Sequence, residues 1–361
     1  MHTNIGIIGC GNISGAYFHG AKHATNLTLK ACADLYPAVA LARAEEHGVQ
    51  AMTVDELLAD PEISLVVNLT IPAAHVDVGL RILEAGKHVY AEKPLATDLQ
   101  SGRVLIDTAQ ERGLRVGSAP DTFLFKGAQT SRKLIDDGWI GEPLSGTAFM
   151  KCHGHENWHP NPGFYYEVGG GPLMDMGPYY LTALVNFLGP IKSVMARCTR
   201  GFRERLATSE LANGRMLPVS VDTHCAGILE FHSGPVITMI MSFDTWKASL
   251  PALILHGTQG SLNIGDPNSF SANPLLFRAE DNEERAIAFT HANNQRMIGV
   301  VDMVDAIAGN RPHRASGELA LHVLEAMVAF DTSSKGGAAV ELKTRPDRPD
   351  ALPLGLPAWR V

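Results

Sequence analysis

The sequence lacks any cluster of basic residues. Its 361 residues include 38 Asp and Glu against 30 Lys and Arg, so the formal net charge is −8. A protein that binds DNA or RNA neutralises the phosphates with a basic surface. We therefore expect no nucleic-acid partner.

Cysteines and long apolar runs are also scarce. The five cysteines are odd in number and show no C-x-x-C spacing, which is typical of reduced thiols. No stretch approaches the roughly 18 consecutive apolar residues of a membrane helix, and the first residues lack the pattern of a signal peptide. We therefore expect a cytoplasmic protein with no membrane partner.

The overall composition is that of a folded globular protein. Hydrophobic residues make up 45% of the chain and charged residues 19%, and the mean hydropathy is +0.01. These values argue against a disordered chain. At about 150 residues per domain, the length predicts two domains.

The first 120 residues alternate between strand-like and helix-like patterns, which predicts βαβ units and a doubly wound parallel sheet of the Rossmann type. The last of the expected helices begins with Thr97 and has Gln100 three residues later, which indicates a capping box. The expected strands are 5–8, 27–33, 65–69, 88–90 and 115–117, and the expected helices are 37–47, 73–85 and 98–112.

After Pro120 the pattern changes to long strands and a few helices. We predict an α+β domain with a large, open-faced, mostly antiparallel sheet, including a hairpin at residues 257–260. The fold class is thus α/β, with a dinucleotide-binding domain at 1–120 and a substrate-binding and oligomerisation domain at 121–361. The expected strands include 145–152, 225–231 and 236–243, and the expected helices are 123–137, 172–188, 294–308 and 317–331.

A glycine-rich turn joins the first strand to the first helix. Gly9 and Gly11 allow the backbone to turn sharply and approach a pyrophosphate, followed by Asn12 and Ile13 at the helix start. Asp34 ends the second strand, where its carboxylate can bind a ribose hydroxyl and would repel a 2′-phosphate. The turn therefore favours NAD over NADP, although Asp34 could also merely cap the next helix.

Two further strand ends reach the same edge of the sheet. Thr70, Pro72 and His75 follow the strand at 65–69, and we expect them to contact the cofactor, although they could equally be an ordinary helix start. Glu92 and Lys93 follow the strand at 88–90, where a ligand of a parallel sheet binds. Lys93 could orient or deprotonate a substrate hydroxyl, and Glu92 could offset its charge.

The second cluster of candidate residues lies at residues 169–180. Three glycines precede a helix-like stretch in which Asp175 and Tyr179 are four residues apart and therefore share one face. Pro178 within the stretch predicts a kink or a late helix start. This polar face could be solvated, but the glycines suggest that the backbone passes close to a ligand.

Together these motifs resemble the Gfo/Idh/MocA family, which includes glucose-fructose oxidoreductases and inositol dehydrogenases. The resemblance covers most of the chain and implies a Rossmann domain, an open-faced sheet domain, an NAD or NADP cofactor, and a sugar or cyclitol substrate. It also implies that Lys93 and Asp175 contact the reacting hydroxyl. Many members have histidine where this chain has Tyr179, so either Tyr179 or Lys93 could be the acid/base.

A competing motif is the H-E-x-x-H pattern of His155, Glu156 and His159, which resembles a zinc-hydrolase site. Gly154 before the motif and Pro160 after it disfavour the helix that zinc binding requires. We instead expect a loop at the crevice, which predicts that His155 and His159 contact substrate. Trp158 or His159 is expected to pack beside the cofactor, although an ordinary histidine-rich surface loop is an equal alternative. Asp121 and Thr122 are weaker candidates for contact with the substrate.

The sequence thus predicts an enzyme that transfers a hydride between NAD and a carbinol carbon of a sugar, cyclitol or related polyol, without a metal. A redox-neutral glycosidase or epimerase that uses NAD is an alternative, followed by a non-catalytic NAD-binding regulator and a zinc hydrolase. The open face of an antiparallel sheet needs a cover, so we expect a homodimer or homotetramer that assembles through this sheet.

Overall fold

The computed structural model describes residues 2–361, and the chain forms two compact units. The first comprises the chain up to Phe125, His291–Leu324 and Leu352–Val361. The second comprises Lys126–Thr290 and Glu325–Ala351. Each unit consists of segments that are not consecutive in the sequence. The expected boundary at residue 120, between a cofactor-binding and a substrate-binding domain, stays a prediction.

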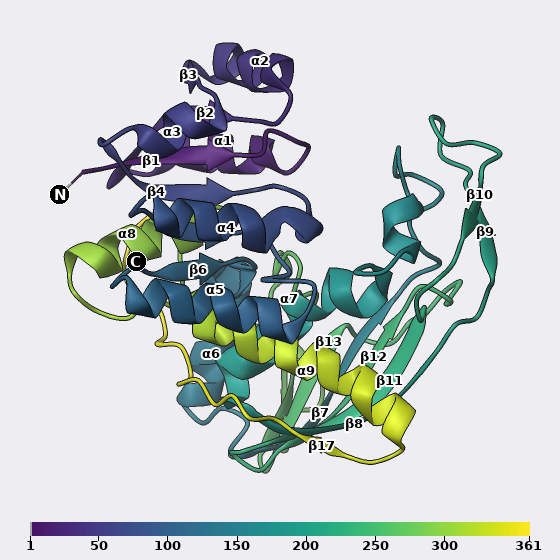
Figure 1. The fold of residues 1–361 in the computed structure, drawn as a ribbon. Coiled ribbons are helices and arrows are strands. Elements are labelled where there is room, and N and C mark those ends of the chain that lie inside the picture. Colours follow the sequence, from purple (N-terminus) through teal and green to yellow (C-terminus); the bar gives the residue numbers. More distant parts are fainter. Residues whose placement is uncertain (1) are drawn as a thin grey trace. The chain divides into compact units, whose positions relative to one another are not determined.

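The first unit contains a parallel sheet whose strand order, β3-β2-β1-β4-β5-β6, is that of a Rossmann fold (Figure 1). This order confirms the doubly wound sheet expected from the sequence. The central strands β1, β4, β5 and β6 are largely buried because they are apolar and covered on both faces, whereas β3 at the edge of the sheet is exposed. Within residues 2–361 they are β1 (Thr3–Ile8), β2 (Leu27–Ala33), β3 (Gln50–Ala51), β4 (Ile63–Asn68), β5 (His88–Ala91) and β6 (Val116–Ser118).

Helices flank this sheet, and α4 lies beside α5 on one face (Figure 1). Leu57, Ile82 and Leu105 belong to one buried cluster with the strands, so α3, α4 and α5 cover the same core. The expected capping box at Thr97 is wrong, because Asp98 caps α5 through the backbone N–H of Ser101. The helices are α1 (Ser14–His23), α2 (Pro37–His47), α3 (Val54–Ala59), η1 (Pro72–Ala74), α4 (His75–Glu84), α5 (Leu99–Glu111), η2 (Thr122–Leu124) and α8 (Ile298–Ala308).

The second unit contains a mixed sheet with the order β16-β15-β14-β13-β7-β12-β11-β8-β17. β7 and β12 pair in parallel and the other neighbours pair antiparallel, which confirms a large, mostly antiparallel sheet. The expected hairpin joins β13 to β14 through residues 258–259. The strands are β7 (Pro143–Lys151), β8 (Ile191–Thr199), β11 (His224–Phe231), β12 (Val236–Ser242), β13 (Leu253–Gly257), β14 (Gly260–Asn263), β15 (Leu275–Arg278), β16 (Arg285–Ala286) and β17 (Val340–Glu341).

Helix α7 (Gly171–Leu188) packs on β7, β11 and β12 and also contacts α6 (Lys126–Asp136). It runs through Pro178 without interruption, so the expected late start is wrong. Its polar residues Thr182 and Asn186 are buried rather than solvated. Helix α9 (Gly317–Gly336) and a separate ribbon of β9 (Glu204–Leu206) and β10 (Met216–Pro218) complete the main elements (Figure 1).

None of the helices within residues 2–361 is both long enough and apolar enough to cross a membrane.

Candidate functional site

The glycine turn between β1 and α1 combines one strained glycine with one open one. Gly9 has φ of +99°, and a Cβ there would lie 2.6 Å from the carbonyl carbon and oxygen of Leu69. Gly11 is exposed, and a Cβ there would meet no atom within 4 Å. Asn12 and Ile13 are also exposed at the start of α1. The turn thus has the room that a pyrophosphate needs at a helix N-terminus.

Asp34 holds this turn in place from the end of β2. One carboxylate oxygen accepts a 2.8 Å hydrogen bond from the backbone N–H of Cys10, and the other accepts a 2.9 Å bond from that of Tyr36. The second bond closes a turn before α2 and is not the helix cap that the sequence left open, because Tyr36 is the N-cap of α2 and no side chain caps this helix. Each oxygen has a further lone pair, and Asp34 is half-buried, so the carboxylate can still accept a ribose hydroxyl. Asp34 and the open turn therefore fit a dinucleotide.

The loop after β4 is organised by buried side chains. Asn68 accepts hydrogen bonds from the backbone and hydroxyl of Thr70, at 3.2 and 2.7 Å. His75 is 1% exposed, and its ring nitrogens lie 2.7 Å from the Pro94 carbonyl oxygen and 3.0 Å from that of Thr70. This geometry favours a role for His75 in joining two strand-end loops, and leaves Thr70 and Pro72, which are half-buried, nearer to solvent.

Lys93 is half-buried at the end of β5, and a buried carboxylate lies beside it. Glu92 is 6% exposed and accepts bonds from the Tyr17 hydroxyl at 2.8 Å and from the Lys93 backbone N–H at 3.0 Å. Glu92 therefore fixes the main chain at Lys93 from inside the protein. Direct contact between Glu92 and a cofactor is not favoured by this burial.

Asp121 and Thr122 lie deeper than expected for substrate contacts. Asp121 is fully buried, and one carboxylate oxygen accepts a 3.1 Å bond from the backbone N–H of Gly299. The other oxygen has no hydrogen-bond partner among the described residues. Burial raises the pKa of Asp121 to about 6, against the opposing charge of Arg296. Thr122 is 1% exposed, so direct contact of either residue with a substrate is not favoured by this burial.

The second unit brings His155 to Asp175. The imidazole Nε2 lies 3.3 Å from a carboxylate oxygen of Asp175, and both side chains are mostly buried. Tyr179 follows one turn later on α7 and is 6% exposed. Helix α7 thus places two groups that can handle a hydroxyl proton on one face, with a histidine from a distant loop beside them.

The H-E-x-x-H segment does not form the zinc site. Residues 155–159 lie in a turn and not in a helix. Glu156 binds Arg205 at 2.7 Å and accepts a bond from the Tyr166 hydroxyl, so it is not available as a base. His159 Nδ1 accepts a 3.1 Å bond from the backbone N–H of Asn161, and its ring packs edge-on against Trp158.

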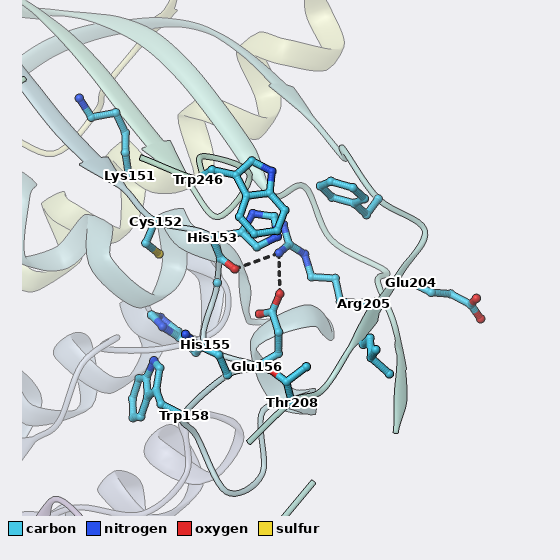
Figure 2. Close-up of a pocket in the computed structure, with 14 residues that line it drawn as sticks. Lys151, Cys152, His153, His155, Glu156, Trp158, Glu204, Arg205, Thr208 and Trp246 are labelled. Atoms are coloured by element: carbon cyan, nitrogen blue, oxygen red, sulfur yellow. Dashed lines mark hydrogen bonds and ion pairs between the residues drawn. The ribbon is translucent and has the colours of Figure 1, made fainter. Parts of the chain in front are cut away.

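A cavity of about 920 Å³ opens beside this loop, with Trp158 and His155 in its wall (Figure 2). Its other walls include His153, Arg205 and Trp246, which the sequence did not identify as site residues. No spacing rule joins them, because they lie up to about ninety residues apart along the chain and meet only when the sheet forms.

Comparisons with known proteins agree with this geometry. Residues 3–119 match the model described as the oxidoreductase family with an NAD-binding Rossmann fold, and residues 128–263 match the GFO/IDH/MocA C-terminal domain. The chain is 27% identical over 349 residues to 1,5-anhydro-D-fructose reductase of Ensifer adhaerens, covering 94% of this chain and 98% of that protein. It is 26% identical over 355 residues to D-glucoside 3-dehydrogenase of Escherichia coli K12, covering 94% and 97%.

A solved structure of levoglucosan dehydrogenase with NADH and L-sorbose has the same fold, with a TM-score of 0.79 at 21% identity over 94% of this chain and 99% of that one. The family models together span most of the chain, and the order of the motifs agrees with them. The chain therefore belongs to the Gfo/Idh/MocA family of oxidoreductases, with an NAD-binding Rossmann domain.

Proposed function

We propose that this protein oxidises or reduces one carbinol carbon of a sugar, cyclitol or related polyol with NAD. The observation that carries the proposal is the half-buried Lys93 at the carboxyl end of β5, backed by the buried carboxylate of Glu92. Ligands of a parallel sheet bind at these strand ends. The sugar-active relatives that match nearly the whole chain support the same substrate class.

The chain's own residues handle the hydroxyl. The Lys93 ammonium donates a hydrogen bond to the substrate oxygen and stabilises negative charge that develops there. Either the deprotonated Tyr179 phenolate or, in place of its ammonium form, the neutral Lys93 amine takes the hydroxyl proton. Asp175 orients the hydroxyl together with His155. The chemistry that bound NAD would supply is that of a hydride acceptor for the same carbon.

We propose NAD as the preferred cofactor. The Asp34 carboxylate would repel a 2′-phosphate, and the next residues are Leu35 and Tyr36, which offer no positive charge. A solved relative binds NADH, which supports the same choice.

We also propose assembly through the nine-stranded sheet. Met195 on β8 lies directly opposite Ile228 on β11, and these side chains are 53% and 49% exposed. Val236 on the next strand is 44% exposed. An apolar patch of this kind is typical of an interface, so a homodimer or homotetramer is expected. All five cysteines are unpaired, which supports the expected cytoplasmic location.

The test is a panel of sugars and cyclitols, with NAD and NADP reduction followed by absorbance. Lys93→Ala and Tyr179→Phe should each lower kcat/KM by about 10²- to 10⁴-fold, because each removes a group that acts on the hydroxyl proton. Binding of NADH to Tyr179→Phe should stay within about twofold of the unmodified protein.

Near-normal turnover by Lys93→Ala would contradict the mechanism. Cleavage or epimerisation of a sugar without net NADH formation would instead identify the redox-neutral alternative. A protein that binds NAD, turns over none of the compounds and keeps its NAD affinity when Asp175 is replaced would instead be a regulator.

A further inference from the structure

The cavity in the second unit is larger than the reacting hydroxyl requires. It has a volume of about 920 Å³, and His155 in its wall also contacts Asp175 of the proposed reacting centre. We propose that this cavity is a second sugar-binding subsite, which holds the ring linked to the reacting sugar, so that the preferred substrate is a glycoside of at least two rings. This inference rests on the proposed sugar oxidation and narrows its substrate class.

The first supporting feature is a preformed aromatic platform. The Trp246 indole stacks on the His153 imidazole, with ring centroids 3.3 Å apart and planes 15° apart (Figure 2). Trp246 is nevertheless 80% exposed, so the indole face that His153 does not cover is open to a ligand. A pyranose ring presents an apolar C–H face that packs on such a surface, with its hydroxyls directed outward.

Other exposed aromatic side chains surround the same cavity. Trp158 is 59% exposed and contacts His155 edge-on at 5.3 Å. Phe202 is 43% exposed and contacts His153 edge-on at 6.0 Å. Exposed aromatic groups gathered around one cavity are a mark of a binding site and are not expected on a surface that meets solvent alone.

A buried ion network holds this platform rigidly. The Arg205 side chain is 3% exposed and donates to Glu156 at 2.7 Å and to the His153 carbonyl oxygen at 3.1 Å (Figure 2). It also donates to the Phe243 carbonyl oxygen at 2.7 Å and to Asp244. These bonds fix the loop through groups of the chain itself, which reduces the entropy cost of binding.

The polar groups of the cavity favour a neutral ligand. Two cations and two carboxylates line it, so their charges balance. Burial lowers the pKa of His153, which keeps its ring uncharged near neutral pH, and its Nδ1 is buried without a hydrogen-bond partner among residues 2–361. A sugar hydroxyl can satisfy such an atom, whereas a phosphorylated or acidic sugar would find no excess positive charge. The charged lining residues are Lys151, Arg205, Glu156 and Glu204.

The test compares free sugars with matching disaccharides, using glucose with maltose and cellobiose, and xylose with xylobiose. For the unmodified protein, kcat/KM should be higher for a disaccharide. Trp246→Ala should lower the ratio of kcat/KM for disaccharide over monosaccharide by about tenfold or more, mainly through KM. Trp246→Phe should restore part of this ratio because it keeps an aromatic face.

Trp139→Phe is the matched control, because Trp139 is 40% exposed in the same unit but does not line the cavity. It should leave the ratio unchanged. An unchanged ratio in Trp246→Ala would overturn the subsite while leaving the dehydrogenase intact. A changed oligomeric state in Trp246→Ala, without a change in the ratio, would also overturn it and would identify the aromatic groups as an interface.

Calorimetric binding of the same disaccharides separates the two proposals. Binding that Trp246→Ala weakens, in a protein that oxidises no sugar, would support the subsite and refute the proposed function. Failure of all the disaccharides to bind at millimolar concentration would overturn the subsite.

Discussion

The two candidate sites of this protein are built from different parts of the chain. At the glycine turn, the candidate site consists of main-chain groups, namely Gly9, Gly11 and the start of α1. In the second unit, side chains such as Arg205 and Trp246 form it. A main-chain site requires particular backbone conformations, whereas a side-chain site requires that distant segments meet.

Because of this difference, a substitution should damage each candidate site in a different way. In the turn, one extra methyl group changes the backbone or fills the ligand space. In the cavity, loss of one partner leaves other buried charges without compensation. The following three predictions test this contrast, in order of decreasing expected effect.

The largest change in stability should follow Arg205→Met. Glu156 is 7% exposed and would lose its cationic partner, and removal of one partner of a buried ion pair costs about 3–5 kcal/mol. Urea unfolding followed by tryptophan fluorescence should show this loss, while NADH affinity should change little. Lys335→Met is the control, because its pair with Asp331 is exposed and should contribute nothing measurable.

If Arg205→Met were as stable as the unmodified protein, the bonds of Arg205 would not be the interactions that hold the walls of the cavity in place.

A smaller but more specific effect is expected at the turn. Gly9→Ala should destabilise the protein by about 1–3 kcal/mol from its left-handed φ alone, with further cost from the overlap with Leu69. Gly11→Ala should leave the melting temperature unchanged, because its methyl group meets no protein atom, yet weaken NADH binding at least about tenfold by filling the space of the pyrophosphate.

Thermal melts and NADH titrations of this pair separate the two roles. Normal NADH affinity in Gly11→Ala would show that the pyrophosphate does not bind at this turn.

The smallest expected change in stability concerns Asp121. It is a buried side chain in the first unit, where the candidate site otherwise consists of main-chain groups. Its pKa is about 6 when folded, above the ordinary value of 3.8, so the folded state binds more protons and stability falls as pH rises through this window. Asp121→Asn removes this titration. The free energy of unfolding of the variant, relative to that of the unmodified protein, should therefore increase by on the order of 2 kcal/mol between about pH 4 and pH 8.

Urea unfolding at both pH values measures this difference, with Asp77→Asn on the exposed side of α4 as the control. A difference that does not grow with pH would show that Asp121 is ionised throughout.

Local patterns predicted the strands and long helices of this chain but not its smallest elements. The helix α3 was missed because it has six residues, although Thr53 and Glu56 form a capping box there. The capping box was instead expected at Thr97, but the N-cap residue of α5 is Asp98. Helix α7 was located correctly, but its polar face is buried, because burial depends on what packs against a helix and not on its own period.

The sequence alone determined the family, the parallel and antiparallel sheets, and the candidate residues Lys93, Asp175 and Tyr179. It could do so because strand ends, glycine turns and helix faces follow from neighbouring residues. The tertiary structure decided that Asp121 and His75 are buried, and that Arg205 and Trp246 share one cavity. These outcomes depend on contacts between segments far apart in the chain, and no local period of the sequence encodes them.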